Sequence, residues 1–207
     1  MTFGLPEWRQ PLSALDELVS TILSQNTNDV NRDAAFNRLQ ERFPGWEAVR
    51  DAPEKAVVEA IRPAGLANQK APRMQTILRQ ITEERSDLCL DFLSGMGREK
   101  AHAWLSRFKG VGPKTAAIVL QFALGIPAFP VDTHVYRVSN RLGLRPEKMG
   151  VEAAHTWLEQ MFTPEQYGPG HLNLIRLGRE ICHARKPECG LCPLNKLCDY
   201  FQNLQKA

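Results

Sequence analysis

The sequence has 207 residues, of which 43% are hydrophobic and 24% charged, which is enough for one large or two small packed domains. This composition excludes disordered, collagen-like and coiled-coil chains, and no apolar run is long enough to cross a membrane. The formal net charge of +3 permits an anionic partner without requiring one. Residues 1–8 lack a basic stretch followed by an apolar core, so we expect no secretory signal and a cytoplasmic protein.

Helical periodicity runs through almost the whole chain. Leu12, Leu15, Leu18 and Ile22 recur at helix spacing, and Ser13 occupies the N-cap position of this first helix. Further helices, bounded by proline or glycine, are predicted over 30–43, 53–62, 72–84, 87–94, 98–108, 113–124, 132–142, 150–161, 170–182 and 193–203. No segment shows convincing strand alternation, so the predicted fold class is all-α.

A glycine-containing turn joins two of these helices. Gly110 and Gly112 bracket the apolar Val111, and Pro113 suits the first position of the next helix. Val111 is expected to fill the gap between the helices, while the free backbone amides form a nest for a phosphate oxygen. Such a hairpin would bind a nucleic-acid backbone without reading its sequence. An ordinary corner between two helices is the alternative.

Two polar residues begin helices after this turn. Lys114 follows Pro113, where the positive end of the helix dipole disfavours an ammonium and favours a neutral, nucleophilic amine. Most surface lysines have no catalytic role, so this position needs support from other residues. Asp132 opens the helix predicted over 132–142, where an N-cap is worth about 1 kcal/mol.

Four of the five cysteines are clustered in the pattern C-x6-C-x2-C-x5-C: Cys182, Cys189, Cys192 and Cys198. Four thiolates so close together indicate an inorganic site rather than packing. Structural zinc sites usually use paired C-x2-C knuckles, whereas a four-iron cluster accepts ligands from one compact loop. The spacing favours the cluster and leaves zinc open. The fifth cysteine, Cys89, lies between two leucines and is expected to be buried.

Two groups of basic residues are candidates for phosphate contact. Arg185 and Lys186 lie in the loop between the first two clustered cysteines. Arg137, Arg141 and Arg145 recur every four residues and could line a phosphate track, although Gly143 is placed to end the helix before the third arginine. For both groups a solvated surface is the alternative.

Taken together, these motifs resemble the endonuclease III family of DNA glycosylases. The resemblance rests on residues 108–116 (FKGVGPKTA), residues 130–138 (PVDTHVYRV) and the four cysteines, in that order. It extends to residues 22–29 (ILSQNTND) and 64–71 (AGLANQKA), and so covers nearly the whole chain. It implies that the cysteines hold a [4Fe–4S] cluster rather than zinc.

The resemblance also implies a two-domain helical fold. A six-helix barrel domain would span 16–126 and contain a helix-hairpin-helix at about 101–124. Residues 1–15 and 127–207 would form the iron–sulfur cluster domain, with the cluster loop at 182–198. The DNA cleft is expected between the two domains.

Residue by residue, Lys114 matches the family's Schiff-base lysine and Asp132 its catalytic aspartate. Asn26 takes the place of a polar residue, often glutamine, that enters the gap left by an extruded base. Leu66 matches an apolar wedge, with an ordinary buried leucine as the alternative. The full set of expected DNA contacts is Asn26, Leu66, Gly110, Val111, Gly112, Thr115, His134, Arg185 and Lys186.

The predicted function is a bifunctional DNA glycosylase/AP lyase that removes oxidised pyrimidines from duplex DNA. Its expected partner is double-stranded DNA with damaged bases or abasic sites, bound by a monomer that is nucleoid-associated in a bacterium. The alternatives are a monofunctional adenine or mismatch glycosylase and a non-catalytic DNA-binding protein. The adenine branch has a catalytic glutamate where this chain has Thr21, and the presence of both Lys114 and Asp132 argues against a non-catalytic module.

Overall fold

The computed structural model describes residues 3, 4, 6 and 10–206. The chain forms two compact units: the hairpin unit, Pro11–Ile126, and the cysteine unit, Met1–Gln10 with Pro127–Ala207. All regular structure among the described residues is helical, which confirms the predicted all-α class. None of the helices in the described part combines the length and apolar character needed to span a membrane.

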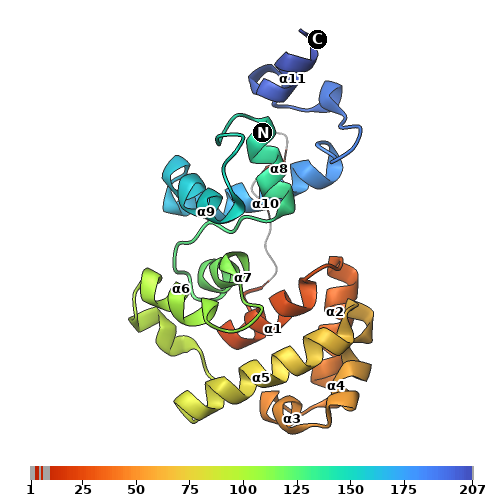
Figure 1. The fold of residues 1–207 in the computed structure, drawn as a ribbon, viewed down its shortest axis with the longest axis vertical. Coiled ribbons are helices and arrows are strands. Elements are labelled where there is room, and N and C mark those ends of the chain that lie inside the picture. The colour runs from red at the N-terminus through yellow and green to blue at the C-terminus, as the bar shows by residue number, and fades with distance from the viewer. Residues whose placement is uncertain (1–2, 5, 7–9, 207) are drawn as a thin grey trace. The chain divides into compact units, whose positions relative to one another are not determined.

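The hairpin unit contains seven α-helices in its described residues (Figure 1). They are α1 (Ala14–Ser24), α2 (Asp29–Arg42), α3 (Trp46–Asp51), α4 (Glu54–Ile61), α5 (Ala67–Arg85), α6 (Arg98–Ser106) and α7 (Pro113–Ile118). Short turns complete it: η1 (Arg62–Ala64), η2 (Asp91–Gly95) and the π-helical η3 (Val119–Ala123).

Helix α1 lies at the centre of this unit and packs against α2, α5 and α7. Ser13 caps it as predicted, because its Oγ accepts the backbone N–H of Asp16 at 3.1 Å. Leu18 and Ile22 are no more than 1% exposed, so the apolar positions read from the sequence do form the core. Burial of such side chains is worth about 1.5–3 kcal/mol each, which fixes the end of α1 firmly.

The largest error in the predicted elements concerns residues 87–94. No α-helix forms there, because α5 ends at Arg85, its C-cap Ser86 takes the left-handed conformation, and only the η2 turn follows. Cys89 is exposed, so its predicted burial is wrong. In this irregular segment the neighbouring Leu90 takes the interior position, at 1% exposure.

The cysteine unit contains α8 (Thr133–Arg141), α9 (Val151–Met161), α10 (Tyr167–Glu180) and α11 (Asp199–Leu204), with the turns η4 (Pro164–Gln166), η5 (Cys189–Leu191) and η6 (Asn195–Leu197). Its core includes Phe129, Val135, Leu158 and Leu177. Helices α8 and α10 pack closely, and a Cβ at Gly178 would lie 2.9 Å from the ring of His134. Glycine therefore permits this contact.

Candidate functional site

The hairpin forms as the glycine pattern predicts. Helix α6 ends at Ser106, and the Val111 N–H donates to the carbonyl oxygen of Phe108 at 2.9 Å to close the turn. Gly110 has φ +90°, a conformation that favours glycine. Val111 is 3% exposed and occupies the interior position expected of it, while both glycines of the turn remain exposed.

Lys114 is the second residue of α7, directly after Pro113. Its side chain is half-buried, so part of it is accessible from solvent. Thr115, expected to contact DNA, is 4% exposed, and its hydroxyl therefore faces the interior. Any contact from Thr115 would have to come from its backbone.

Asn26 and Leu66, the two residues expected to enter opened DNA, share an unusual backbone. Asn26 has φ +53° and Leu66 has φ +50°, a left-handed conformation that is costly for a leucine. Both side chains are exposed, Leu66 to 47%. The alternative of an ordinary buried leucine is therefore wrong. Strained, exposed residues of this kind are typical of functional sites.

Asp132 is the N-cap of α8, as its position in the sequence indicates. Its Oδ1 accepts the Val135 N–H at 2.7 Å, and the side chain is half-buried. This bond orients the carboxylate. Because the cap uses one oxygen of the pair, capping leaves room for a second role.

Two buried histidines, not identified from the sequence, hold the residues before Asp132. The Nδ1 of His171 bonds the Pro130 carbonyl oxygen at 2.8 Å, and that of His155 bonds the Phe129 carbonyl oxygen at 3.0 Å. Since a carbonyl only accepts, each Nδ1 carries a proton. His155 and its partner are separated by 26 residues in the sequence, and His171 and its partner by 41. No local sequence pattern reveals contacts over such separations.

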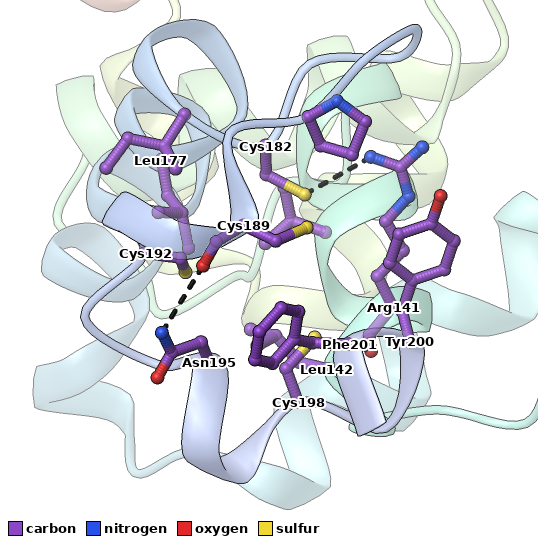
Figure 2. A pocket seen from close by; sticks show the side chains of 13 residues that line it. Arg141, Leu142, Leu177, Cys182, Cys189, Cys192, Asn195, Cys198, Tyr200 and Phe201 are labelled. Carbon is purple, nitrogen blue, oxygen red and sulfur yellow. Dashed lines mark hydrogen bonds between the residues drawn. The ribbon is translucent and has the colours of Figure 1, made fainter. Parts of the chain in front are cut away.

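The four clustered cysteines line one cavity in the cysteine unit, as Figure 2 shows. They come from the end of α10, from η5 and from the residue before α11, so three short segments converge on it: Cys182, Cys189, Cys192 and Cys198. Apolar side chains such as Leu142, Leu177 and Phe201 form much of the remaining wall.

These thiols suit a cationic centre. Burial, followed by the neighbouring Cys182, Cys198 and Cys192, raises the pKa of the Cys189 thiol. Burial also raises the pKa of Cys192. Four thiolates in an apolar cavity therefore need positive charge, which the iron of a cluster supplies. The donor set and its surroundings fit a [4Fe–4S] cluster.

The predicted phosphate track of three arginines is wrong. Arg141 donates from Nη1 to Cys182 Sγ at 3.3 Å, and Arg137 donates from Nε to the Cys182 carbonyl oxygen at 3.1 Å. Arg145 is 5% exposed and donates from Nη2 to the Tyr136 carbonyl oxygen at 2.9 Å. These guanidinium groups therefore donate hydrogen bonds within the cysteine unit. Helix α8 ends at Arg141, so Arg145 does not share its face. Sequence spacing also did not show that carbonyl groups of residues 178–184 meet Arg137 and Arg141.

The other predicted contacts of this unit differ in exposure. Arg185 and Lys186 are exposed on the loop between the first two cysteines. His134 is half-buried, and its Nδ1 lies 3.1 Å from Nη2 of Arg137. The loop residues are thus the more accessible to a phosphate.

Replacing Cys192 with serine should remove the iron and the visible absorbance of the protein, because one thiolate ligand is lost. The cysteine unit should also lose stability, since metal binding contributes directly to folding. Iron analysis and absorption spectra of anaerobically purified protein provide the measurement. Cys89→Ser is the matched control, because Cys89 is exposed and lies outside the cavity. Full iron content in Cys192→Ser would contradict the assignment of this ligand.

A buried lysine in the hairpin unit was also missed from the sequence. Lys70 is 2% exposed, and its Nζ donates to the carbonyl oxygens of Leu23 at 2.7 Å and Ala64 at 2.8 Å. Burial is the main cause that lowers the pKa of Lys70 to about 8. The two carbonyl groups belong to the segments that lead to Asn26 and Leu66.

The stability of the protein should rise with pH through the titration of Lys70. Between pH 8 and 10.5 the unfolded chain keeps the proton and the folded chain loses it, so deprotonation favours folding. A neutral amine still donates two hydrogen bonds, so both contacts survive. From pH 7.5 to 9.5, the unfolding free energy of the wild type should increase by about 1–2 kcal/mol relative to Lys70→Met. Urea unfolding at both pH values tests this, and a constant difference would contradict it.

Comparison with known proteins identifies the class of protein. Residues 19–164 match the HhH-GPD superfamily of base excision DNA repair proteins, and residues 182–198 match the iron-sulfur binding domain of endonuclease III. The chain belongs to this helix-hairpin-helix superfamily of DNA repair proteins.

Individual relatives show which branch of the superfamily the chain resembles. The chain is 33% identical over 189 residues to an endonuclease III of Rickettsia conorii, covering 91% of this chain and 85% of that protein. It is 46% identical over 135 residues to a putative DNA glycosylase of Arabidopsis thaliana, covering 65% of this chain but only 46% of the plant protein. A trapped endonuclease III–DNA covalent intermediate matches with a TM-score of 0.82 and 27% identity, over 99% of this chain and 92% of that one.

Within the superfamily, the protein is therefore a member of the endonuclease III family. It is a DNA-binding glycosylase/AP lyase of base excision repair that carries a [4Fe–4S] cluster. The family, fold class, enzyme class and cofactor predicted from the sequence are confirmed.

Proposed function

We propose that this enzyme removes oxidised pyrimidines from duplex DNA, with Lys114 as the nucleophile and Asp132 as the catalytic carboxylate. The observation that carries the proposal is the half-buried Lys114, the second residue of α7, directly after the hairpin turn. A monofunctional glycosylase has no need of an amine at this place. Asp132, oriented by its cap to α8, supplies the negative charge that the reaction requires.

The chemistry follows from these two groups. Breaking the bond between base and deoxyribose develops positive charge on the sugar, which the Asp132 carboxylate stabilises. Asp132 helps to take a proton from Lys114, and the amine then attacks C1′ while the base leaves with the bonding electrons. Loss of a second proton from the nitrogen and opening of the sugar ring give an imine. The imine acidifies C2′, so removal of a C2′ proton expels the 3′ phosphate and cuts the strand. Hydrolysis of the imine then returns the free amine.

The remaining residues would hold opened DNA. Asn26 enters the space left by the extruded base, and Leu66 presses into the stack on the opposite strand. Backbone amides of Gly110 and Gly112, with the exposed Arg185 and Lys186, bind phosphates. The bound cluster would act structurally, by fixing the loop that carries these basic residues.

Two departures from the family pattern bear on the range of lesions. Asn26 has a shorter side chain than the usual glutamine, and Ala67 is small where some relatives carry an aromatic residue. Both positions adjoin the proposed opening of the duplex. We expect them to alter the preference for the opposite base. The enzyme is proposed to act as a monomer in the cytoplasm, associated with the nucleoid if the source is a bacterium.

The test uses duplexes that contain a single thymine glycol, a single 5-hydroxycytosine, an abasic site or no damage. We expect strand cutting by β-elimination on the first three, together with a covalent protein–DNA band when borohydride is added. Release of the base with an intact strand would overturn the lyase assignment. A band on abasic DNA alone would retain the lyase and overturn the proposed substrate class.

A further inference from the structure

The side chain of Gln25 joins two segments of the hairpin unit that are far apart in the sequence. Its Nε2 donates to the carbonyl oxygen of Gly110 at 2.9 Å, and its Oε1 accepts from Nη1 of Arg73 at 3.1 Å. Both ends of the amide are therefore engaged, which fixes its orientation. Gln25 is the C-cap of α1 and directly precedes Asn26. We call the set of Gln25, Arg73 and the Gly110 carbonyl the latch.

Arg73 also supports the hairpin turn directly. A Cβ added to Gly110 would lie 2.4 Å from Cδ of Arg73 and 2.6 Å from its Nε. Gly110 thus leaves the space that the Arg73 side chain fills, in addition to its φ of +90°. The turn that is proposed to bind phosphate rests on an arginine of α5.

Helix α5 also fixes the segment that carries Leu66, the proposed wedge. Lys70, one turn before Arg73, bonds the Leu23 and Ala64 carbonyl oxygens. Ala64 lies two residues before Leu66. Helix α5 therefore holds the end of α1, the Leu66 turn and the hairpin together through side-chain contacts.

This inference rests on the function proposed above. We propose that Gln25 and Arg73 are positioning residues for base opening, which hold Asn26 at a fixed place relative to the hairpin turn. Extruding a base requires the side chain that fills the gap and the backbone that binds phosphate to act on the same few nucleotides. Displacement of such groups by about 1 Å can lower a rate by about 100-fold. An abasic site has no base to extrude, so its cleavage depends less on this alignment.

The test compares Gln25→Ala with the wild type in single-turnover cleavage of two duplexes, one with thymine glycol and one with an abasic site. We expect the rate on the lesion to fall about tenfold and the rate on the abasic site to change less than about twofold. Enzyme concentrations are set by borohydride trapping on abasic DNA, so both rates refer to active molecules.

Two further variants separate the latch from a general loss of stability. Gln25→Glu keeps an acceptor for Arg73 but cannot donate to the Gly110 carbonyl, so it should show the same selective defect. The double variant Gln25→Ala/Arg73→Ala should be no worse than the more impaired single variant, because the two side chains act as one unit. Arg79→Ala is the matched control, since Arg79 is also an α5 arginine that donates to a backbone carbonyl, that of Arg50 at 3.1 Å.

Equal rate losses on both duplexes, or wild-type rates in Gln25→Glu, would overturn the proposal. A wild-type enzyme that cleaves neither duplex would instead overturn the proposed function, so the two failures are distinguishable. If Gln25→Ala does not fold, Gln25→Glu carries the comparison, because it keeps the size of the side chain and its contact with Arg73.

Discussion

Replacing Lys114 with alanine should abolish the covalent protein–DNA band and lower strand cutting by at least about 10³-fold. The reason is chemical: without the amine no imine forms, and without the imine the C2′ proton is not acidified. Gel analysis of borohydride-treated abasic and thymine glycol duplexes provides the measurement. The fold should be retained, since Lys114 is half-buried and has no core position.

Lys109→Ala is the control for this experiment. Lys109 is an exposed lysine of the same hairpin, so its removal changes the net charge by the same amount. Weaker DNA binding in both variants, with trapping lost only in Lys114→Ala, would assign the nucleophile. A band of normal intensity from Lys114→Ala would show that another amine forms the imine.

Replacing Asp132 with asparagine should lower the glycosylase rate by about 10²–10⁴-fold without loss of stability. Asparagine caps a helix about as well as aspartate, so its side-chain oxygen can still accept the Val135 N–H. Only the negative charge is lost. Single-turnover base release and thermal unfolding of the same preparation measure the two effects.

Asp132→Ala separates the two roles of this side chain. It removes the charge and the cap together, so the unfolding free energy should also fall by about 1 kcal/mol. Equal activity of Asp132→Asn and wild type would contradict a catalytic role. Reduced stability of Asp132→Asn would show that the carboxylate contributes to the fold beyond its cap to α8.

The sequence predicted well those features that depend on nearby residues. The turn formed because Gly110 supplies the positive φ and Val111 is the one apolar side chain between the two glycines. Gly112 has φ −90° and does not need this freedom. The caps at Ser13 and Asp132 formed because their partners lie three residues away. Each of these signals is contained in a single helix or turn.

Predictions failed where the burial or the hydrogen-bond partners of a side chain depend on how the chain folds around it. Arg137, Arg141 and Arg145 are spaced as one helix face, but α8 ends at Arg141 and Arg145 lies beyond it. Carbonyl groups of a distant segment engage Arg137 and Arg141, and Arg145 turns back to the Tyr136 carbonyl oxygen of α8. Cys89 was expected to be buried between two leucines, but no α-helix forms around it and it is exposed.

The sequence by itself determined the class of helical fold, the hairpin and the clustering of four cysteines. Through the family resemblance it also determined the cofactor and the enzyme class. These depend on local backbone preferences and on residue types that only certain chemistry requires. Only the tertiary structure decided that α5 joins the hairpin to the end of α1. Gln25 lies 85 residues from Gly110 and 48 from Arg73 in the sequence. Contacts over such distances are set by how helices pack, and packing depends on every core side chain at once.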